Sequence, residues 1–217
     1  MSAHGLNPAS TLGVVAGGVL LVGAYERGTV ALSIGLTMTV LATFLWFLAG
    51  TDRERVGGSI AATLFGVVYV PFLGAHVVMM RSLHHGAAIT ICYLGLTAFY
   101  DIGAYAFGSL FGHHLIAPEI SPKKSWEGAI GATFFISIVA LAAGPFIRPF
   151  GLWSALTLAI AVAILAPLGD FAESLIKRDL DVKDMGSILP GHGGLLDRID
   201  ALLFVAPAAF WLARAIA

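Results

Sequence analysis

Long apolar runs alternate with short polar segments along most of this chain. A helix that crosses a bilayer needs roughly 20 mainly apolar residues. About seven runs approach that length, at 10–24, 30–50, 59–80, 87–111, 129–147, 152–169 and 201–217. The pattern predicts an all-α, polytopic membrane protein in which residues 1–217 form a single integral membrane domain.

Composition supports this class and removes others. Of the 217 residues, 58% are hydrophobic and 12% are charged, whereas a soluble domain carries about 25% charged residues. The single cysteine, Cys92, excludes an internal disulfide and a cysteine-based zinc site. No basic stripe with interleaved aromatic residues is present, so we expect no nucleic-acid partner.

The basic residues predict how the chain is oriented in the membrane. Cytoplasmic loops carry an excess of Lys and Arg. Alternating spans sort the chain's basic residues into one set of eight and another of four. The larger set, which we expect on the cytoplasmic side, is Arg53, Arg55, Lys123, Lys124, Lys177, Arg178, Lys183 and Arg198. Two polar loops, 112–128 and 170–200, then share the cytoplasmic face.

Most of the acidic residues lie in one polar segment between the last two apolar runs. Seven of the chain's thirteen acidic residues fall there: Asp170, Glu173, Asp179, Asp181, Asp184, Asp197 and Asp200. Such charges beside a bilayer are costly unless they are hydrated, paired or bound to an ion. The spacing of Glu173, Lys177 and Asp181 predicts a short amphipathic helix after residue 169.

A glycine-rich turn follows that helix. Gly191, Gly193 and Gly194 flank His192, and such a turn can direct successive backbone N–H groups at one anion. Carboxylates with a glycine turn and basic side chains suit a site for Mg²⁺ and polyphosphate, because Mg²⁺ prefers oxygen ligands. A solvated, salt-bridged loop is the structural alternative.

The other polar loop, 112–128, offers donors for phosphate. They are Lys123, Lys124 and Ser125, in a segment that Pro118 and Pro122 stiffen. The alternative is a membrane anchor in which Ser125 caps the following helix.

One ionisable residue lies inside an apolar run. Asp101 falls within residues 87–111, and an intramembrane carboxylate is a functional hypothesis by default. Its expected partner is a cation, either a metal ion or a lysine from the polar loops. A buried structural pair is the alternative, and an ion transporter that uses Asp101 is another functional class.

The chain resembles the phosphatidate cytidylyltransferases at these residues. The family's C-terminal signature is matched by Ser174, Lys177, Arg178, Lys183, Asp184, Leu189, Pro190, His192, Gly193, Gly194, Asp197, Arg198 and Asp200. Residues 101–105 and 121–128 resemble the family's middle motifs. The similarity extends from about residue 87 to the C-terminus, and the first three runs resemble the family only in being apolar. Other members usually have additional N-terminal sequence.

The resemblance implies a reaction and a set of roles. CTP and phosphatidate would give CDP-diacylglycerol and pyrophosphate, with Mg²⁺ and an accompanying monovalent cation such as K⁺. It also implies a homodimer in the inner membrane. Asp170 and Asp197 are the implied metal ligands, with Asp200 assisting.

The remaining site residues are expected to handle phosphates. Lys177, Arg178, Lys183 and the glycine turn would cradle them, together with Ser174 and Arg198 of the signature. Lys123, Lys124, Ser125 and Asp101 would contact a substrate. A CTP-dependent kinase that acts on a polyprenol is a second enzymatic hypothesis.

Overall fold

A computed structural model describes residues 5–51, 54–186 and 194–216 of the chain. The chain divides into two compact units, Met1–Ser82 and Leu83–Ala217, which are described separately below. Six helices among the described residues are long and apolar enough to cross a membrane. The prediction of an all-α, polytopic membrane protein is therefore confirmed. The prediction of a single domain stays a prediction.

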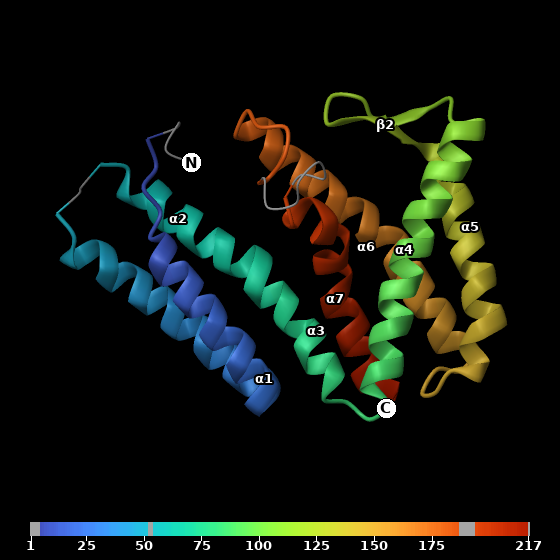
Figure 1. Cartoon of the computed structure of the whole chain (residues 1–217), viewed down its shortest axis with the longest axis horizontal. Coiled ribbons are helices and arrows are strands. Elements are labelled where there is room, and N and C mark those ends of the chain that lie inside the picture. Colours follow the sequence, from blue (N-terminus) through green and yellow to red (C-terminus); the bar gives the residue numbers. More distant parts are fainter. Residues whose placement is uncertain (1–4, 52–53, 187–193, 217) are drawn as a thin grey trace. The chain divides into compact units, whose positions relative to one another are not determined.

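The first unit begins with a helix that reverses direction. Helix α1, Ser10–Ala49, is interrupted at Gly28, where φ is 61° and ψ is −139°. Only glycine adopts that conformation readily. A Cβ atom added at Gly35 would lie 2.7 Å from the Leu20 side chain, although a straight helix would separate the two residues by roughly 22 Å. The two halves therefore lie antiparallel (Figure 1), as expected from separate apolar runs at 10–24 and 30–50.

A second apolar helix completes this unit. Helix α2, Val56–Val67, continues through the π-helical turn η2, Val68–Phe72, into α3, Leu73–Arg81. The π-helical turn contains Pro71. Proline has no N–H to donate, and the wider turn accommodates the missing hydrogen bond without ending the helix.

The described part of the second unit, 83–186 and 194–216, holds four long helices and one hairpin. In chain order they are α4 (Gly86–Phe111), β1 (Leu115–Ala117), β2 (Ser121–Ser125), α5 (Trp126–Ala143), the 3₁₀ turn η3 (Gly144–Phe146), α6 (Leu152–Asp179) and α7 (Leu196–Ile216). Helix α4 packs on α5, and α6 packs on α5 and α7. The Tyr93 hydroxyl joins α4 to α7 by donating to the Leu202 carbonyl at 2.8 Å.

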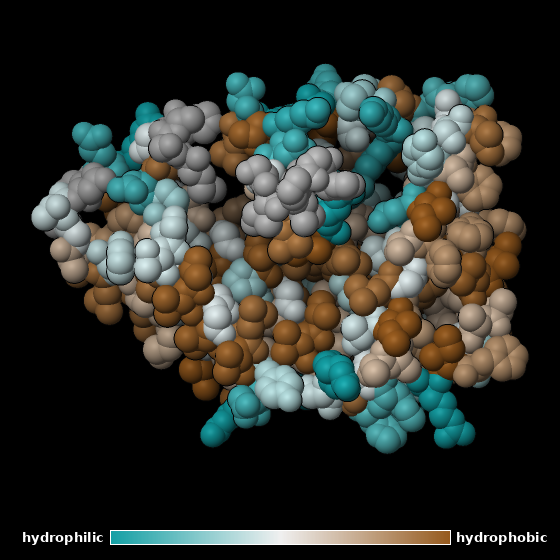
Figure 2. All heavy atoms as spheres, viewed as in Figure 1, coloured by the Kyte–Doolittle hydropathy of each residue, from teal (hydrophilic) through white to brown (hydrophobic). Residues whose placement is uncertain are grey.

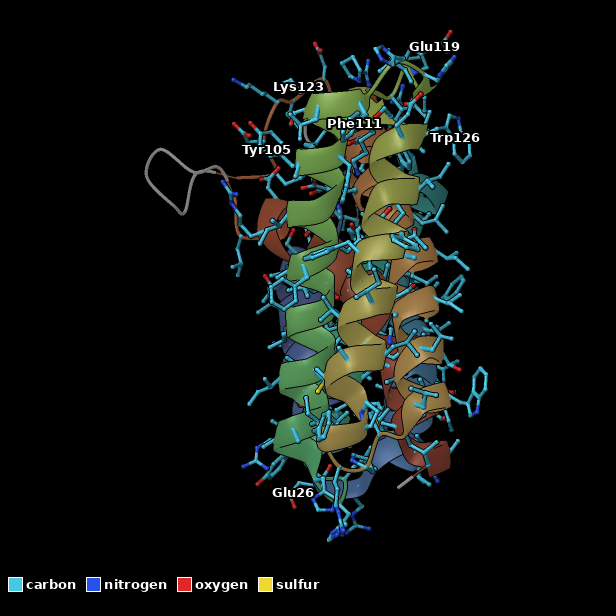
Figure 3. All side chains as sticks on the ribbon, turned by 90° about the vertical axis from the view of Figure 1, so that its right-hand side faces the viewer. Glu26, Tyr105, Phe111, Glu119, Lys123 and Trp126 are labelled. Carbon is cyan, nitrogen blue, oxygen red and sulfur yellow. The ribbon has the colours of Figure 1, made fainter. Side chains whose placement is uncertain are left out.

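Polar side chains of the second unit gather at the ends of its helices. In Figure 2, hydrophobic residues fill the middle of its visible face, and hydrophilic residues lie along the upper and lower edges. Figure 3 shows Tyr105, Glu119, Lys123 and Trp126 at the same end of these helices. This distribution fits a bundle that exposes its apolar flanks to lipid.

One predicted boundary is wrong. The sixth apolar run was expected to end at residue 169, with a separate short helix after it, yet α6 continues without a break to Asp179. The run loses its hydrophobicity there, but the charged residues that follow keep helical spacing, so the helix extends with a polar face. Lys183 and Asp184 lie beyond its end.

Candidate active site

A cavity of about 610 Å³ lies in the second unit, between α4, the hairpin, α5, α6 and α7. It collects residues that are far apart in the sequence. Eight of its lining residues were predicted from sequence as site residues: Asp101, Lys123, Lys124, Ser125, Asp170, Asp197, Arg198 and Asp200. Residues from both polar segments, 112–128 and 170–200, therefore line one cavity in this unit.

Helix α4 contributes one face to the cavity. Leu94, Thr97, Asp101 and Ala104 recur at three- and four-residue spacing, which places them on a single side of a helix. Tyr105 also lines the cavity, and its side chain is exposed. The same wall is therefore apolar toward Leu94 and polar toward Asp101 and Tyr105.

The hairpin brings a lysine to the carboxylates of α6. Lys124 forms an ion pair with Asp170, and its ammonium lies 4.7 Å from the centre of the Phe171 ring. Asp101 is close enough to interact electrostatically with both Lys124 and Asp170. Asp101 therefore has a lysine from a polar loop near it, although its functional role stays a prediction.

Ser125 begins the next helix. Its hydroxyl accepts a hydrogen bond from the Gly128 N–H at 3.2 Å, which caps the N-terminus of α5. The serine is buried and also lines the cavity. The capping alternative from the sequence is thus confirmed, and the phosphate-binding alternative stays a prediction.

A close contact between α6 and α7 sets the positions of two carboxylates. A Cβ atom added at Gly169 would lie 2.7 Å from the Asp200 carbonyl oxygen and 2.9 Å from the Ala201 Cα. The absence of a side chain at residue 169 therefore allows the backbones to touch. Asp170 follows directly, and its carboxyl group is close enough to that of Asp200 for the two to interact electrostatically.

Asp197 is held by three donors. One oxygen accepts from the Lys177 ammonium at 2.9 Å. The other accepts from the backbone N–H groups of Met185, at 2.9 Å, and Gly194, at 2.8 Å. These bonds fix the carboxylate at the start of α7 and tie it to both sides of the segment 187–193.

Glu173 is the carboxylate that sequence reasoning left out of the site. It is 3% exposed, and one of its oxygens accepts from Lys177 at 2.6 Å. Its Oε1 atom has no hydrogen-bond partner among the described residues. Lys177 therefore bridges Glu173 and Asp197. The sequence signal was the spacing of Asp170, Glu173 and Lys177 at three and four residues, which places them on one face of α6.

Some predicted site residues lie outside the main cavity. Lys177, Arg178 and Lys183 border a neighbouring open groove of about 540 Å³. Ser174 lies on α6 one turn after Asp170, and it lines neither cavity. Gly191, His192 and Gly193 fall outside the described residues, so the glycine turn stays a prediction apart from the contact that Gly194 makes with Asp197.

Glu127 holds the connection between α4 and the hairpin. Its carboxylate accepts from the backbone N–H groups of His113 and His114, each at 3.2 Å. It also contacts the His114 ring nitrogen Nδ1 at 2.6 Å. This role depends on contacts with residues 13 and 14 positions earlier in the chain, which local sequence does not encode.

The carboxylates fit a small metal site better than a closed protein cage. Within the residues that the structure describes, no group of three or more His, Cys, Asp or Glu side chains is arranged to hold a metal ion. Asp170 and Asp200 are nevertheless close together, and Asp197 lines the same cavity. Mg²⁺ is usually held by one or two carboxylates with substrate phosphates supplying further oxygens, so this donor set is suitable.

Fold and cavity define a class: a polytopic helical membrane protein with a charged cavity at one end of its second unit. The model of the cytidylyltransferase family matches residues 5–216. The chain therefore belongs to the cytidylyltransferase family. This match includes the first unit. The expectation that the similarity to the family begins near residue 87 is therefore wrong, because the similarity begins near residue 5.

Proteins named phosphatidate cytidylyltransferase are similar to this chain. The protein from Mycobacterium bovis is 35% identical over 195 residues, which cover 84% of this chain and 64% of the relative. That from Mycobacterium leprae is 34% identical over 197 residues, covering 84% and 63%. That from Staphylococcus aureus strain COL is 46% identical over 108 residues, covering 49% and 42%. The chain thus spans at most 64% of the length of these relatives.

Proposed function

We propose that this chain transfers the cytidylyl group of CTP to phosphatidate, forming CDP-diacylglycerol and pyrophosphate for phospholipid synthesis. Family membership and the names of the relatives support this proposal. One structural observation carries it. A lysine from the hairpin and carboxylates from α6 and α7 converge on a cavity that also has apolar walls at Leu94 and Leu202. Both substrates bring phosphates, and one also brings acyl chains.

The proposed reaction is a substitution at phosphorus. A phosphate oxygen of phosphatidate attacks the α-phosphorus of CTP, and the bond from that phosphorus to the oxygen shared with the β-phosphate breaks. The electron pair leaves with pyrophosphate. Phosphatidate is already an anion at neutral pH, so no general base is required. Catalysis then rests on positioning and on neutralising charge.

The chain's own residues supply both. Lys123 and Lys124 place positive charge at the cavity, where they would pair with phosphate oxygens. Lys177 fixes Asp197, and the contact at Gly169 fixes Asp170 beside Asp200. Leu94 and Leu202 offer an apolar surface to the lipid.

We also propose Mg²⁺ as the cofactor, held by Asp170 and Asp197 with help from Asp200. When bound, a divalent cation neutralises triphosphate charge and stabilises the leaving pyrophosphate. Manganese offers a readout that is independent of turnover. We expect Mn²⁺ bound to the CTP-loaded protein to give a paramagnetic resonance signal that Asp170→Asn weakens. An unchanged signal would remove Asp170 from the proposed ligands. The monovalent cation stays a prediction from the family resemblance.

Orientation and assembly belong to the same proposal. We place the cavity on the cytoplasmic side of the inner membrane, because CTP is a cytoplasmic substrate and basic residues favour that side. Six of the eight residues in the larger basic set line the cavity or the neighbouring groove: Lys123, Lys124, Lys177, Arg178, Lys183 and Arg198. A Glu119→Cys label with an impermeant maleimide, in a Cys92→Ser background, tests this in inverted vesicles. A homodimer is proposed on the resemblance alone, and cross-linking of purified protein in bilayers tests it.

Labelled CTP distinguishes this function from the kinase alternative. CTP labelled at the α-phosphorus should pass its label to phosphatidate, with the label recovered in the lipid phase. CTP labelled at the γ-phosphorus should leave its label in aqueous pyrophosphate. Transfer of the γ label to a polyprenol would support the kinase instead and contradict the proposal. Ion flux without substrate in liposomes would support a transporter.

A further inference from the structure

The hairpin is too small to hold its own position. Strand β1 has three residues and β2 has five, and among the described residues each pairs only with the other. Their pairing joins Leu115 to Ser125 and Ala117 to Ser121, with an irregularity between. An isolated two-stranded ribbon is marginally stable in water. The position of Lys124, which the hairpin carries, therefore depends on contacts with the rest of the unit.

The base of the hairpin is anchored to α5. Glu127 accepts from the backbone of His113 and His114, and the Trp126 N–H donates to the His114 carbonyl at 2.9 Å. These contacts lie where the ribbon leaves the helices. These contacts fix the base of the hairpin but do not set the direction of its tip.

The tip is anchored to α6 by Arg178. The Nε–H group of Arg178 donates to the Ile120 carbonyl at 2.8 Å, in a turn that the Ile120 N–H closes on the Ala117 carbonyl at 3.0 Å. A hydrogen bond from a charged donor is roughly twice as strong as a neutral one. The acceptor is a main-chain atom, so this contact recognises the path of the turn rather than a particular side chain.

Two contacts on the same helix set the hairpin's direction. Lys124 pairs with Asp170, and the Ile120 carbonyl accepts from Arg178. Asp170 and Arg178 are eight residues apart on α6, or roughly 12 Å along the axis. Two points on a rigid helix, together with the base at α5, determine how the ribbon lies over the cavity. Arg178 borders the neighbouring groove rather than this cavity.

We propose that Arg178 is a positioning residue that acts through the hairpin to hold Lys124 at the cavity, an inference that rests on the proposed function. The sequence had suggested that Arg178 contacts a phosphate. In the structure its Nε–H points instead to a backbone carbonyl 58 residues away in the sequence. Arg178 thereby aligns the group that meets the phosphate.

Three substitutions separate positioning from charge. In Gln the terminal nitrogen stands at the same place along the side chain as the Nε of Arg, so Arg178→Gln keeps a donor there and removes the charge. Arg178→Lys keeps the charge but displaces the donor, and Arg178→Ala removes both. Positioning predicts that Gln retains more activity than Lys, with Ala lowest. Direct phosphate binding predicts that Lys retains the most and that Gln resembles Ala.

A double-mutant cycle tests the route through Lys124. We expect Arg178→Ala alone to lower kcat/KM by about tenfold, no more than the loss of Lys124 itself and on the scale of a lost charge-assisted hydrogen bond. In a Lys124→Ala background the same change should cost less than about threefold, because the group it positions is gone. Independent, multiplicative effects would overturn the proposal.

Hairpin position is also measured without turnover. In a Cys92→Ser background, Glu119→Cys reports the accessibility of the tip through its rate of reaction with a maleimide. We expect Arg178→Ala to raise that rate and Arg178→Gln to leave it near the parent value. Equal rates in all three proteins would overturn the positioning role. Because this readout needs no CTP, it stands even if cytidylyl transfer is not observed.

Discussion

Two cavities lined by described residues of the second unit share α4 and differ in chemistry. The polar cavity of about 610 Å³ is lined by four carboxylates and three basic side chains. The other, of about 200 Å³, is lined almost wholly by apolar side chains from α4, α5 and α6, including Leu96, Phe99 and Leu158. One face of α4 therefore lines the charged cavity, and another face lines the apolar cavity. Because both regions contain a cavity, the placement of charged side chains identifies the site, and the presence of a cavity does not.

The largest difference is expected from the polar cavity's most constrained carboxylate. Asp197→Asn replaces an oxygen acceptor by an amide nitrogen, although both oxygens of Asp197 accept hydrogen bonds. We expect kcat to fall by about 10²- to 10³-fold, as when a preorganised electrostatic group is removed. Glu26→Gln, in the first unit, is the matched control and should leave turnover unchanged. Near-normal turnover of Asp197→Asn would remove this residue from the site.

A glycine in each region gives a sharper contrast. Gly169→Ala would place a methyl group against the α7 backbone beside Asp200, and such overpacking costs about 1–3 kcal/mol. We expect a lower melting temperature and reduced turnover. Gly95 lines the apolar cavity, and a Cβ there meets nothing within 4 Å. Gly95→Ala should leave both quantities near wild type, and equal effects of the two changes would contradict the packing argument.

Lys124→Ala should have a smaller effect than loss of Asp197. The change removes the ammonium that pairs with Asp170, and we expect KM for a phosphate-bearing substrate to rise by about tenfold, consistent with one charge-assisted hydrogen bond. Lys123→Ala, where the side chain is exposed, should change KM less. Steady-state kinetics with each substrate varied in turn makes the measurement. Unchanged kinetics would reduce the hairpin to a membrane anchor.

The apolar cavity should affect stability rather than catalysis. Leu158 is 2% exposed and lines that cavity, so Leu158→Ala is expected to cost about 2–5 kcal/mol of unfolding free energy. Its position on α6 is twelve residues before Asp170, or roughly 18 Å along the axis. KM should therefore stay within about twofold of wild type. A rise in KM comparable to that of Lys124→Ala would show that the two cavities act together.

The lengths of the apolar runs predicted most of the helical architecture. Apolar runs near the length of a bilayer gave the spans, and the short polar segment at Gly28 predicted the reversal inside α1. The end of α6 was missed because hydropathy falls at residue 169 while helical hydrogen bonding continues to Asp179. The hairpin was missed because its strands are short and contain Pro122, which weakens any strand pattern.

The candidate site was predictable where the sequence resembles the family's motifs. The resemblance pointed to Asp170 and Asp197, with Asp200 assisting, and the basic loops placed Lys124 at the same end. The bond from Arg178 to the Ile120 carbonyl was not predictable, because a backbone acceptor leaves no sequence pattern. Glu173 was overlooked because its burial follows from packing between α6 and α7, which local sequence does not encode.

The variant Asp170→Asn tests whether the proposed cytidylyl transfer takes place in the charged cavity. Asp170 lines that cavity and pairs with Lys124, and an isosteric amide there removes the charge with little change in shape. Transfer of α-phosphorus label from CTP to phosphatidate is measured for this variant and wild type in the same bilayers. We expect at least about a 100-fold loss of label in lipid with an unchanged melting temperature. Label transfer at the wild-type rate would contradict the account.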